Sequence, residues 1–573
     1  MPSMTQCAAA VCGTFTLAVC SLAGENVPLP HPPVSTNLHR VRVLLDGDAR
    51  AVWIGDSWCR LHHISRLPYG ALCTWRFEDV TAVCLAHRPG GGLGRAFNYT
   101  DGTGSLEEVN HSTGWTVEVK NGTPAFFALP LNDMTRVYGD PSLLLTGTGV
   151  NTDWIQALGV NNSRFAQTDS GPFARPGDRF HGRLLYYTPA DPLDMTPVVV
   201  LADSAGAVRG SIDLRHAARP KWIQDADPES DPAAAATPSQ INAARIDVLL
   251  EQDVSTGPRL AILQDPALPI AGSSEYWFFA GAVFYRIGQD SARVPGYYHS
   301  GLAQDSWSFN GHAKDEASNG GGGPTGKTFS DEQLLHWLDV TTLDRSQTPV
   351  VIIHMATEGK DREVIDASVR GILARYRTAF AAIGTAPPRF LLVGSYMHRV
   401  GNRPPEESRP FIEDLDAIYE SLASSEPDCA FFSLYRATDG VYFTTDSWGG
   451  PGAQQQARDW LDANGWSTIT FGGQTYNLSS TENGGLDGVM TADGLHLSST
   501  PAAAFYAKLI GDALAASFCP ADFNQDGSVN TLDLLAFLNA WTANDPNGDF
   551  NGDGTWNTLD VLAFLNAYNA PCP

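Results

Sequence analysis

One serine and one aspartate–histidine pair, far apart in the chain, have the residue types and spacing needed to activate a nucleophile. Ser57 follows the apolar run 51–54 and a glycine–aspartate turn, so its hydroxyl should lie just beyond the carboxyl end of a short buried strand. Open α/β sheets place their sites at that end. His496 can accept a proton from the serine, and Asp493, three residues earlier, can hold the imidazole in one tautomer. The three residues predict a catalytic triad, provided that the fold brings them together.

The elements that must position this triad are apolar strands and helices whose apolar residues recur at helical spacing. Short apolar runs are typical of buried strands, and the sequence has five of them, at 51–54, 81–86, 349–353, 389–393 and 429–433. Apolar residues recur at helical spacing in three segments, 366–382, 410–423 and 502–516. The alternating run 40–45 predicts one further strand, leading into the Ser57 region. The pattern predicts an α/β fold with a parallel sheet flanked by helices.

The middle of the chain has a different character. From 95 to 288 helical spacing fades, and short strands alternate with Gly, Pro, Asn and Asp, which is typical of a β-sandwich. We therefore expect an α/β domain in two parts, 37–94 and 289–518, with an inserted β-rich domain at 95–288. Residues 1–23, an apolar stretch that ends in small residues, predict a signal peptide. Residues 519–573 form a separate tail, predicted to be a small α-helical module.

Two sequence blocks resemble those of a known enzyme family. The block 55–57, Gly-Asp-Ser, and the block 493–496, Asp-Gly-Leu-His, resemble the first and last blocks of the SGNH/GDSL hydrolases in order and in position. The resemblance implies acyl transfer to water without a cofactor. Ser57 would attack an ester carbonyl, His496 would take and return the proton, and Asp493 would orient His496.

The resemblance also implies donors for the negative charge that develops on the carbonyl oxygen. These would be the backbone N–H groups of Ser57 and Gln304 and the hydroxyl of Thr357. Gln304 stands where the family has a glycine, and Thr357 where it has an asparagine. Loss of the asparagine should lower the rate by roughly 10²-fold. His354 and Glu358, near the same end of the sheet, would either line the pocket or serve the structure.

The tail contains an internal repeat with two sets of oxygen ligands. Two loops, 522–533 and 549–560, each carry glycine at position 6 and oxygen-bearing residues at positions 1, 3, 5, 7 and 12, the spacing of an EF-hand calcium loop. The predicted ligands are Asp522, Asn524, Asp526, the Ser528 carbonyl, Asp533, Asp549, Asn551, Asp553, the Thr555 carbonyl and Asp560. The repeat resembles the dockerin type I module. That resemblance implies two Ca²⁺ ions and a cohesin-like protein or cell-surface scaffold as partner.

Composition and cysteine content indicate an exported protein. A formal net charge of −26 over 573 residues argues against nucleic-acid binding, and no stretch after the N-terminus is long and apolar enough to span a membrane. Six cysteines follow the signal peptide, an even number typical of disulfides in exported proteins. Cys519 and Cys572 bracket the tail and are expected to pair. Four others either pair among themselves or are small buried apolar residues: Cys59, Cys73, Cys84 and Cys429.

These observations leave three functions open. We favour a secreted or cell-surface serine esterase that acts on ester groups of carbohydrates, acetyl groups among them, with a calcium-dependent tail for attachment. The alternative raised by Gln304 and Thr357 is a binding or structural protein on an SGNH scaffold that has lost its activity. A polysaccharide-degrading glycosidase is suggested only by the company of a dockerin, and the sequence offers no identifiable pair of catalytic carboxylates.

Overall fold

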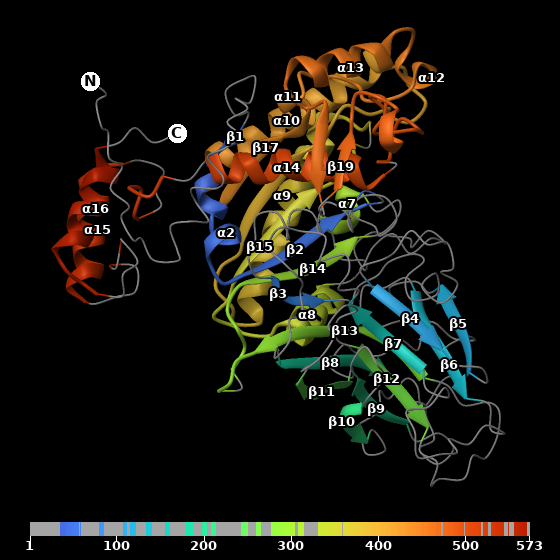
Figure 1. The fold of residues 1–573 in the computed structure, drawn as a ribbon, viewed down its shortest axis with the longest axis vertical. Helices are drawn as coiled ribbons and strands as arrows, with labels where there is room; N and C mark the ends of the chain where they lie inside the picture. Colours follow the sequence, from blue (N-terminus) through green and yellow to red (C-terminus); the bar gives the residue numbers. More distant parts are fainter. Residues whose placement is uncertain are drawn as a thin grey trace, which may run out of the picture.

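The computed structural model has a large mixed sheet with helices and a small helical tail, α15 (Thr531–Thr542) and α16 (Thr558–Tyr568) (Figure 1). The residues whose placement is described are 35–56, 58, 277–290, 292–303, 308–313, 331–357, 359–471, 474–497, 499–516, 519–524, 529–543, 548, 550 and 555–569, with the backbone of the strands within 80–264. Among them, no helix has the length and apolar character needed to cross a membrane.

Six parallel strands form the centre of the sheet. In spatial order they are β17 (Cys429–Ser433), β16 (Arg389–Gly394), β15 (Thr348–His354), β2 (Ala49–Gly55), β14 (Tyr297–Ala303) and β3 (Val80–Cys84). Each pairs with its neighbour in parallel, so their carboxyl ends lie along one edge. All of β2 is buried, as a mostly apolar strand covered on both faces should be. The predicted α/β architecture with a parallel sheet is confirmed.

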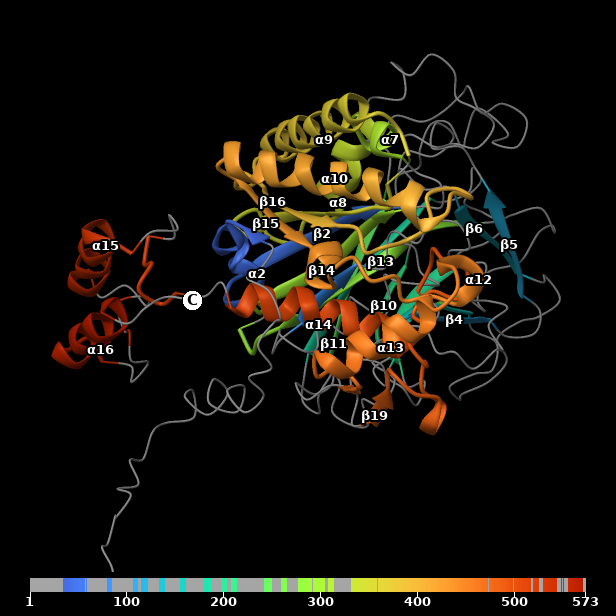
Figure 2. The ribbon, with the colours of Figure 1, turned by 90° about the horizontal axis from the view of Figure 1, so that it is seen from above.

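Helices cover both faces of this sheet (Figure 2). α9 (Arg362–Ala382) and α10 (Pro405–Ser425) lie on one face, and α14 (Thr500–Ala516) lies on the other. α7 (Phe309–Ala313) packs against α9. The buried residues of α9 follow helical spacing and include Ile365, Val369, Ile372, Leu373, Tyr376 and Phe380. They share one apolar core with the strand residues Val351, Ile353, Leu392 and Phe431, and this core fixes the sheet on which the site is built.

The remaining elements of the α/β part are short, apart from α8 and α13. They are β1 (Ser35–Thr36), which pairs antiparallel with β17, α8 (Asp331–Thr341), α11 (Leu434–Ala437), α12 (Asp446–Gly449), α13 (Ala453–Ala463), β18 (Thr468–Phe471), β19 (Gln474–Asn477) and η6 (Glu482–Gly484). β18 and β19 form a separate two-stranded sheet.

The β-rich segment is continuous with the parallel sheet through one strand. β13 (Trp277–Ile287) pairs antiparallel with β3, with β6 (Asp133–Gly139) and with β8 (Arg179–Tyr187). β5 (Trp115–Asn121) extends β6, and β11 (Asn242–Leu249) extends β8. A second sheet has the order β10 (Val208–Asp213), β9 (Pro197–Ala202), β12 (Arg259–Gln264), β7 (Ile155–Val160) and β4 (Glu107–His111). The predicted boundary at 288 falls just after β13, a strand that belongs to both parts.

One predicted strand is wrong. Residues 40–45 are helical: a 3-10 helix, η2 (Leu38–Val41), is followed by one turn of α-helix, α2 (Val43–Asp46). The buried residues lie three apart, on one helical face: Leu38, Val41 and Leu44. Alternation of valine with arginine also fits a strand, and the burial of this helical face decides between the two.

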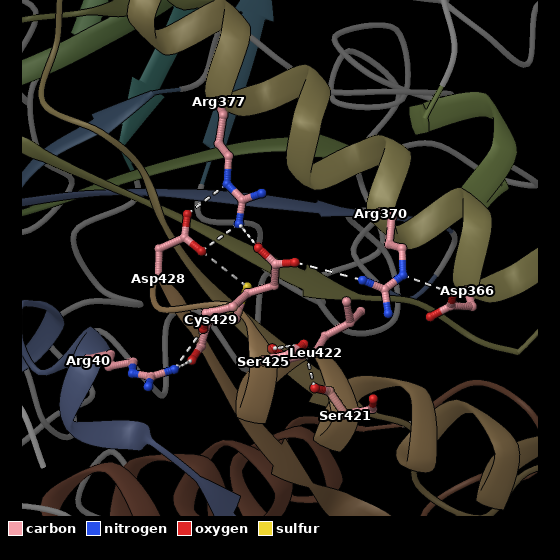
Figure 3. A network of polar contacts seen from close by, with 10 residues as sticks. Arg40, Asp366, Arg370, Arg377, Ser421, Leu422, Ser425, Asp428 and Cys429 are labelled. Carbon is pink, nitrogen blue, oxygen red and sulfur yellow. Dashed lines mark hydrogen bonds and ion pairs between the residues drawn. The ribbon is translucent and has the colours of Figure 1, made fainter.

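A polar network joins this N-terminal segment to the end of α10 and the start of β17 (Figure 3). Nη1 of Arg40 donates to three backbone carbonyl oxygens, at 2.9, 2.8 and 3.0 Å, those of Ala423, Glu426 and Cys429. Figure 3 shows Arg40 beside Cys429. The last carbonyls of a helix have no partner within the helix, so a side-chain donor stabilises them. Glu426 also pairs with Arg377 of α9 at 3.0 Å. The network therefore ties both helices to the sheet.

Cys429 is buried and carries a free thiol. It therefore forms no disulfide with Cys59, Cys73 or Cys84, the three cysteines that could have paired with it. Burial raises the pKa of its thiol, which keeps the sulfur protonated. Cys59 and Cys73 lie outside the described residues, as does the side chain of Cys84.

The two helices of the tail pack as a pair and lie apart from the sheet in both views (Figures 1 and 2). Phe537 of α15 and Phe564 of α16 are fully buried and stack with their ring centroids 4.3 Å apart. Phe523 and Phe550, at equivalent positions of the repeat, pack edge-on against these two rings. The sequence repeat thus builds one small apolar core from two matching halves.

Arg40→Ala should lower the free energy of unfolding by about 2 kcal/mol, because it leaves three carbonyl groups without a charged donor. Urea unfolding of the full chain, followed by circular dichroism, measures the change. Arg345→Ala is the matched control: Arg345 pairs with Asp339 in a bridge whose side chains are 55% and 46% exposed, and its loss should cost less than about 1 kcal/mol. Equal losses in the two variants would contradict the role given to Arg40.

Candidate active site

The carboxyl ends of β2 and β15 are joined by one buried carboxylate, that of Asp56. Its Oδ1 accepts a hydrogen bond from the N–H of Trp58 at 2.8 Å, and its Oδ2 accepts one from the N–H of Ala356 at 3.0 Å. Nε2 of His312, in α7, donates to the carbonyl of Gly55 at 3.1 Å. The end of the strand that precedes residue 57 is therefore held by groups from two other elements.

Three of the predicted site residues, Ser57, Gln304 and Glu358, lie outside the described residues. In the sequence, Ser57 stands between Asp56 and Trp58, which are 7% and 0% exposed. The chain on either side of the predicted nucleophile is therefore buried and hydrogen-bonded. The roles of the three residues stay predictions.

Asp493 and His496 form the hydrogen-bonded pair that a general base requires. Nδ1 of His496 lies 2.7 Å from Oδ2 of Asp493, so the ring donates from Nδ1 and keeps the Nε2 lone pair for a proton. Oδ1 of Asp493 accepts the backbone N–H groups of Leu495 and His496 at 2.9 and 2.7 Å. Partial burial raises the pKa of Asp493, but these hydrogen bonds outweigh it and the net pKa is lowered. The carboxylate stays ionised, and the imidazole, 23% exposed, is accessible from solvent.

The loop that carries this pair is held by residues from two other segments. The backbone N–H and Nε of Arg399 donate to the carbonyl oxygens of Gly494 and Asp493 at 2.9 and 2.8 Å. The hydroxyl of Tyr442 donates to the same Gly494 carbonyl at 2.6 Å. Gly494 has a φ of +74°, and a Cβ there would lie 2.5 Å from the Tyr442 hydroxyl, so the position requires glycine.

One buried ring, Tyr396, connects the two halves of the predicted triad. Trp58 stacks on it with ring centroids 4.4 Å apart and planes 14° apart. The hydroxyl of Tyr396 donates to the carbonyl of Leu495 at 2.7 Å. Trp58 directly follows Ser57 in the sequence, and Leu495 directly precedes His496. The segments at opposite ends of the domain therefore converge on one side chain.

The tyrosine hydroxyl remains a donor throughout the physiological range. Burial raises the pKa of Tyr396 well above its ordinary value, and the nearby carboxylates of Asp56 and Asp493 contribute to the increase. Both carboxylates are therefore within electrostatic reach of the same hydroxyl, which keeps its proton and its bond to Leu495.

Two buried histidines, His354 and His398, lie beside the ring of Trp58, with ring centroids 5.3 and 4.7 Å from it. Burial lowers the pKa of each to about 4 and outweighs their hydrogen bonds to backbone carbonyls. The charges of Arg399 and His496 lower the pKa of His398 further, so these groups are close to one another. Both buried imidazoles are neutral near pH 7.

The segment 395–399 was not identified from the sequence as part of the site. Its signal is its position: the residues Ser-Tyr-Met-His-Arg directly follow the buried strand β16, as the block 55–57 lies at the end of β2. Thr357 follows β15 in the same way and is 6% exposed. The segment after β16 thus supplies Tyr396 and Arg399, which donate hydrogen bonds to the loop of the aspartate–histidine pair, and the end of β2 is followed by Trp58, which stacks on Tyr396.

In the tail, the described parts of the two loops carry buried carboxylates. Asp533 and Asp560, at position 12, are fully buried, and Asp522, at position 1, is 5% exposed. The side chains of Asn530 and Asn557 cap the two helices, and the carboxylates of Asp533 and Asp560 accept their backbone N–H groups at 2.8 Å. An EF-hand calcium loop has oxygen ligands at positions 1 and 12, so buried carboxylates at these positions agree with the predicted ligand sets.

The structure describes only some of the predicted calcium ligands of the tail. Five predicted ligands lie outside the described residues: Asp526, Ser528, Asp549, Asn551 and Asp553. Of the other predicted ligands, Asn524 and Thr555 are exposed. Within the ranges whose placement is described, no three His, Cys, Asp or Glu side chains come together in a way that could hold a metal ion. Cys519 is disulfide-bonded, and Cys572, its predicted partner, lies outside the described residues.

Comparison with known proteins identifies the tail. Residues 520–568 match the dockerin type I domain family, which confirms the resemblance found in the repeat. No curated protein matches the chain in sequence. Among solved structures, a peptidoglycan O-acetylesterase is 12% identical over 84% of this chain and 95% of its own, with a TM-score of 0.41. An acetyl xylan esterase from Butyrivibrio proteoclasticus is 9% identical over 45% of this chain and 79% of its own, with a TM-score of 0.15.

His398→Asn should flatten the pH dependence of stability between pH 6.5 and 4. In the unfolded chain a histidine takes up a proton near pH 6.5, whereas burial holds the folded pKa at about 4. The contribution of His398 is therefore complete above pH 6.5 and is lost as the pH falls, because the unfolded state then binds more protons. Asparagine does not titrate, and its amide can replace the Nδ1 donor to the Tyr396 carbonyl.

Thermal unfolding of the full chain at pH 7, 6, 5 and 4.5 measures this effect. Wild-type stability should fall more steeply than that of the variant, by up to roughly 1.4 kcal/mol per pH unit. Parallel curves would show that His398 is not held neutral in the folded protein.

Proposed function

We propose, from the premise that residues 520–568 are a dockerin type I domain, that the chain is an extracellular SGNH-type serine ester hydrolase. The observation that carries the proposal is the contact of Tyr396 with both Trp58 and Leu495. It supports a triad because it joins the residue after Ser57 to the residue before His496. The oriented pair of Asp493 and His496 supplies the base that a serine nucleophile needs.

The proposed reaction passes through an acyl-enzyme. Oγ of Ser57 attacks the carbonyl carbon of an ester and gives its proton to Nε2 of His496. The imidazolium that results is stabilised by ionised Asp493, 2.7 Å away. It returns the proton to the leaving alcohol oxygen, and the acyl group remains on Ser57. A water molecule, deprotonated by the same imidazole, then releases the acid and restores the serine.

The negative charge on the carbonyl oxygen is held by the backbone N–H groups of Ser57 and Gln304 and by the hydroxyl of Thr357. The position of Thr357 supports its role, because it directly follows Ala356, whose N–H binds Asp56 beside the nucleophile. Removing one donor of this kind lowers kcat by roughly 10²–10³-fold. A hydroxyl in place of an amide should therefore make turnover slow for this class of enzyme.

Ester groups on carbohydrate, acetyl groups in particular, are the proposed substrate. The support is the dockerin domain, which is typical of extracellular carbohydrate-active proteins. The alternative is a binding protein built on the same scaffold. It is favoured by the replacement of two oxyanion-hole residues, with Gln304 and Thr357 in their places.

Two Ca²⁺ ions and a cohesin-like partner complete the proposal. Each loop would bind one ion through its five ligands, and without the ion the carboxylates of a loop repel one another. Four leucines of the tail are between 55% and 57% exposed and occupy equivalent positions of the two helices: Leu532, Leu535, Leu559 and Leu562. Exposed apolar residues on a small module support attachment to another protein.

Ser57→Ala should lower kcat for p-nitrophenyl acetate by roughly 10³-fold or more, because the chain loses its nucleophile. Initial rates of the wild type and the variant at pH 7 and 8 measure the change. Ser424→Ala is the matched control, because this serine is exposed near the end of α10 and should not affect the rate. Equal rates for wild type and Ser57→Ala would reject the nucleophile and favour the binding protein.

Removing calcium from the full chain should unfold the tail and leave the α/β domain folded. Differential scanning calorimetry should show one transition that moves down on addition of a chelator and a second that does not move. At a calcium concentration 100 times the Kd, the ion stabilises the tail by about 2.7 kcal/mol. Asp526→Ala combined with Asp553→Ala should abolish the response. A double variant that responds to calcium like the wild type would refute this ligand set.

A further inference from the structure

An exposed tryptophan lies beside the loop that carries the aspartate–histidine pair. Trp448, in α12, is 38% exposed, and within the described part of the α/β domain it is the one exposed aromatic residue. Most of the other large aromatic side chains there, Trp53, Trp58 and Trp337 among them, are almost completely buried. A single exposed indole needs no explanation by itself. Trp448, however, lies next to the proposed catalytic residues, and this position suggests a function for its exposure.

Trp448 contacts the catalytic loop through Gly494 and Arg399. A Cβ added at Gly494 would lie 3.0 Å from Cγ of Trp448, so the indole packs against the loop backbone. The guanidinium of Arg399 lies 4.7 Å from the centroid of a ring of Trp448, and Nε of the same arginine donates to the carbonyl of Asp493. The cation favours one orientation of the indole, and the residue as a whole remains exposed to solvent.

We infer that Trp448 is a subsite for a sugar ring of the carbohydrate whose ester group reaches Ser57, an inference that rests on the proposed function. The C–H groups on one face of a pyranose are apolar and can cover an indole, while the hydroxyl groups around the ring need polar partners. Exposed Asp446 and Ser447 lie in the same short helix as Trp448, so polar groups are present on this part of the surface. Arg399 adds a cationic donor on the side of the loop.

The charged group beside the indole also indicates which ligand the indole suits, a sugar or an acyl chain. A long acyl chain gains free energy only where an apolar surface encloses it. Trp448 instead has the guanidinium of Arg399 over its ring, so it suits a ligand with an apolar face and a polar edge. The subsite should therefore favour an esterified oligosaccharide over a small ester.

Isothermal titration calorimetry on the full chain tests the subsite without turnover. In the Ser57→Ala background, O-acetylated xylohexaose should bind, and Trp448→Ala should raise its Kd about tenfold. Trp448→Phe, which keeps a ring against Gly494, should raise it by about threefold. Trp556→Ala is the matched control, because Trp556 is 36% exposed but belongs to the tail, and it should leave the Kd unchanged. An unchanged Kd in Trp448→Ala, or no binding to the Ser57→Ala chain, would overturn the subsite.

Kinetics separate this inference from the proposed function. Trp448→Ala should lose about tenfold more kcat/KM on O-acetylated xylohexaose than on p-nitrophenyl acetate, with the difference in KM. Equal losses on both substrates would mean that Trp448 only positions the loop 493–496, and would also overturn the subsite. If wild type and Ser57→Ala hydrolyse p-nitrophenyl acetate equally, the proposed function fails, while calorimetry still decides whether Trp448 binds the sugar.

Discussion

The hydrogen bond from Tyr396 to the carbonyl of Leu495 is the constraint on which the site depends. The ring of Tyr396 is 1% exposed and stacks with Trp58 and with Tyr506 of α14, at centroid distances of 4.4 and 4.7 Å. A hydroxyl that is buried among rings must find an acceptor, and the acceptor here is the residue before His496. The packing of the sheet against α14 therefore determines where the proposed general base lies. Residues that are distant in the sequence from Ser57 and His496 become part of the proposed catalytic geometry in this way.

Burial also controls the charges around the proposed base. His354 and His398 are neutral near pH 7 because burial lowers the pKa of each to about 4. The positive charge that would form on His496 in the proposed reaction is therefore not opposed by these two imidazoles. It is stabilised by Asp493, whose own pKa is lowered. Arg399, which contacts this loop, donates to the Asp493 carbonyl and lies over an indole ring.

The parallel sheet and the tail could be predicted from the sequence because both depend on local pattern. A run such as 349–353 must be buried in an α/β fold, and the spacing of ligands repeats twice in the tail. The pair of Asp493 and His496 could be predicted for the same reason, because the two residues are only three positions apart in the sequence. Residues 40–45 could not be assigned in this way, because the burial of their helical face depends on packing against the distant elements β16, β17 and α14. The contact of Tyr396 with Leu495 is equally non-local, and no pattern in the sequence marks it.

The tail couples its helices to its proposed metal ions through single carboxylates. Asp533 accepts the backbone N–H groups of Asn530 and Asn524, and Asp560 accepts that of Asn557, so each carboxylate holds the start of its helix. The same residues stand at position 12 of the proposed calcium loops. A carboxylate that is fully buried is costly unless a cation or several donors compensate its charge, so loss of the ion destabilises the helix start as well. None of the proposed calcium ligands belongs to the α/β domain, which has its own apolar core. On the proposed function, attachment to a partner would therefore respond to calcium while the α/β domain stays folded.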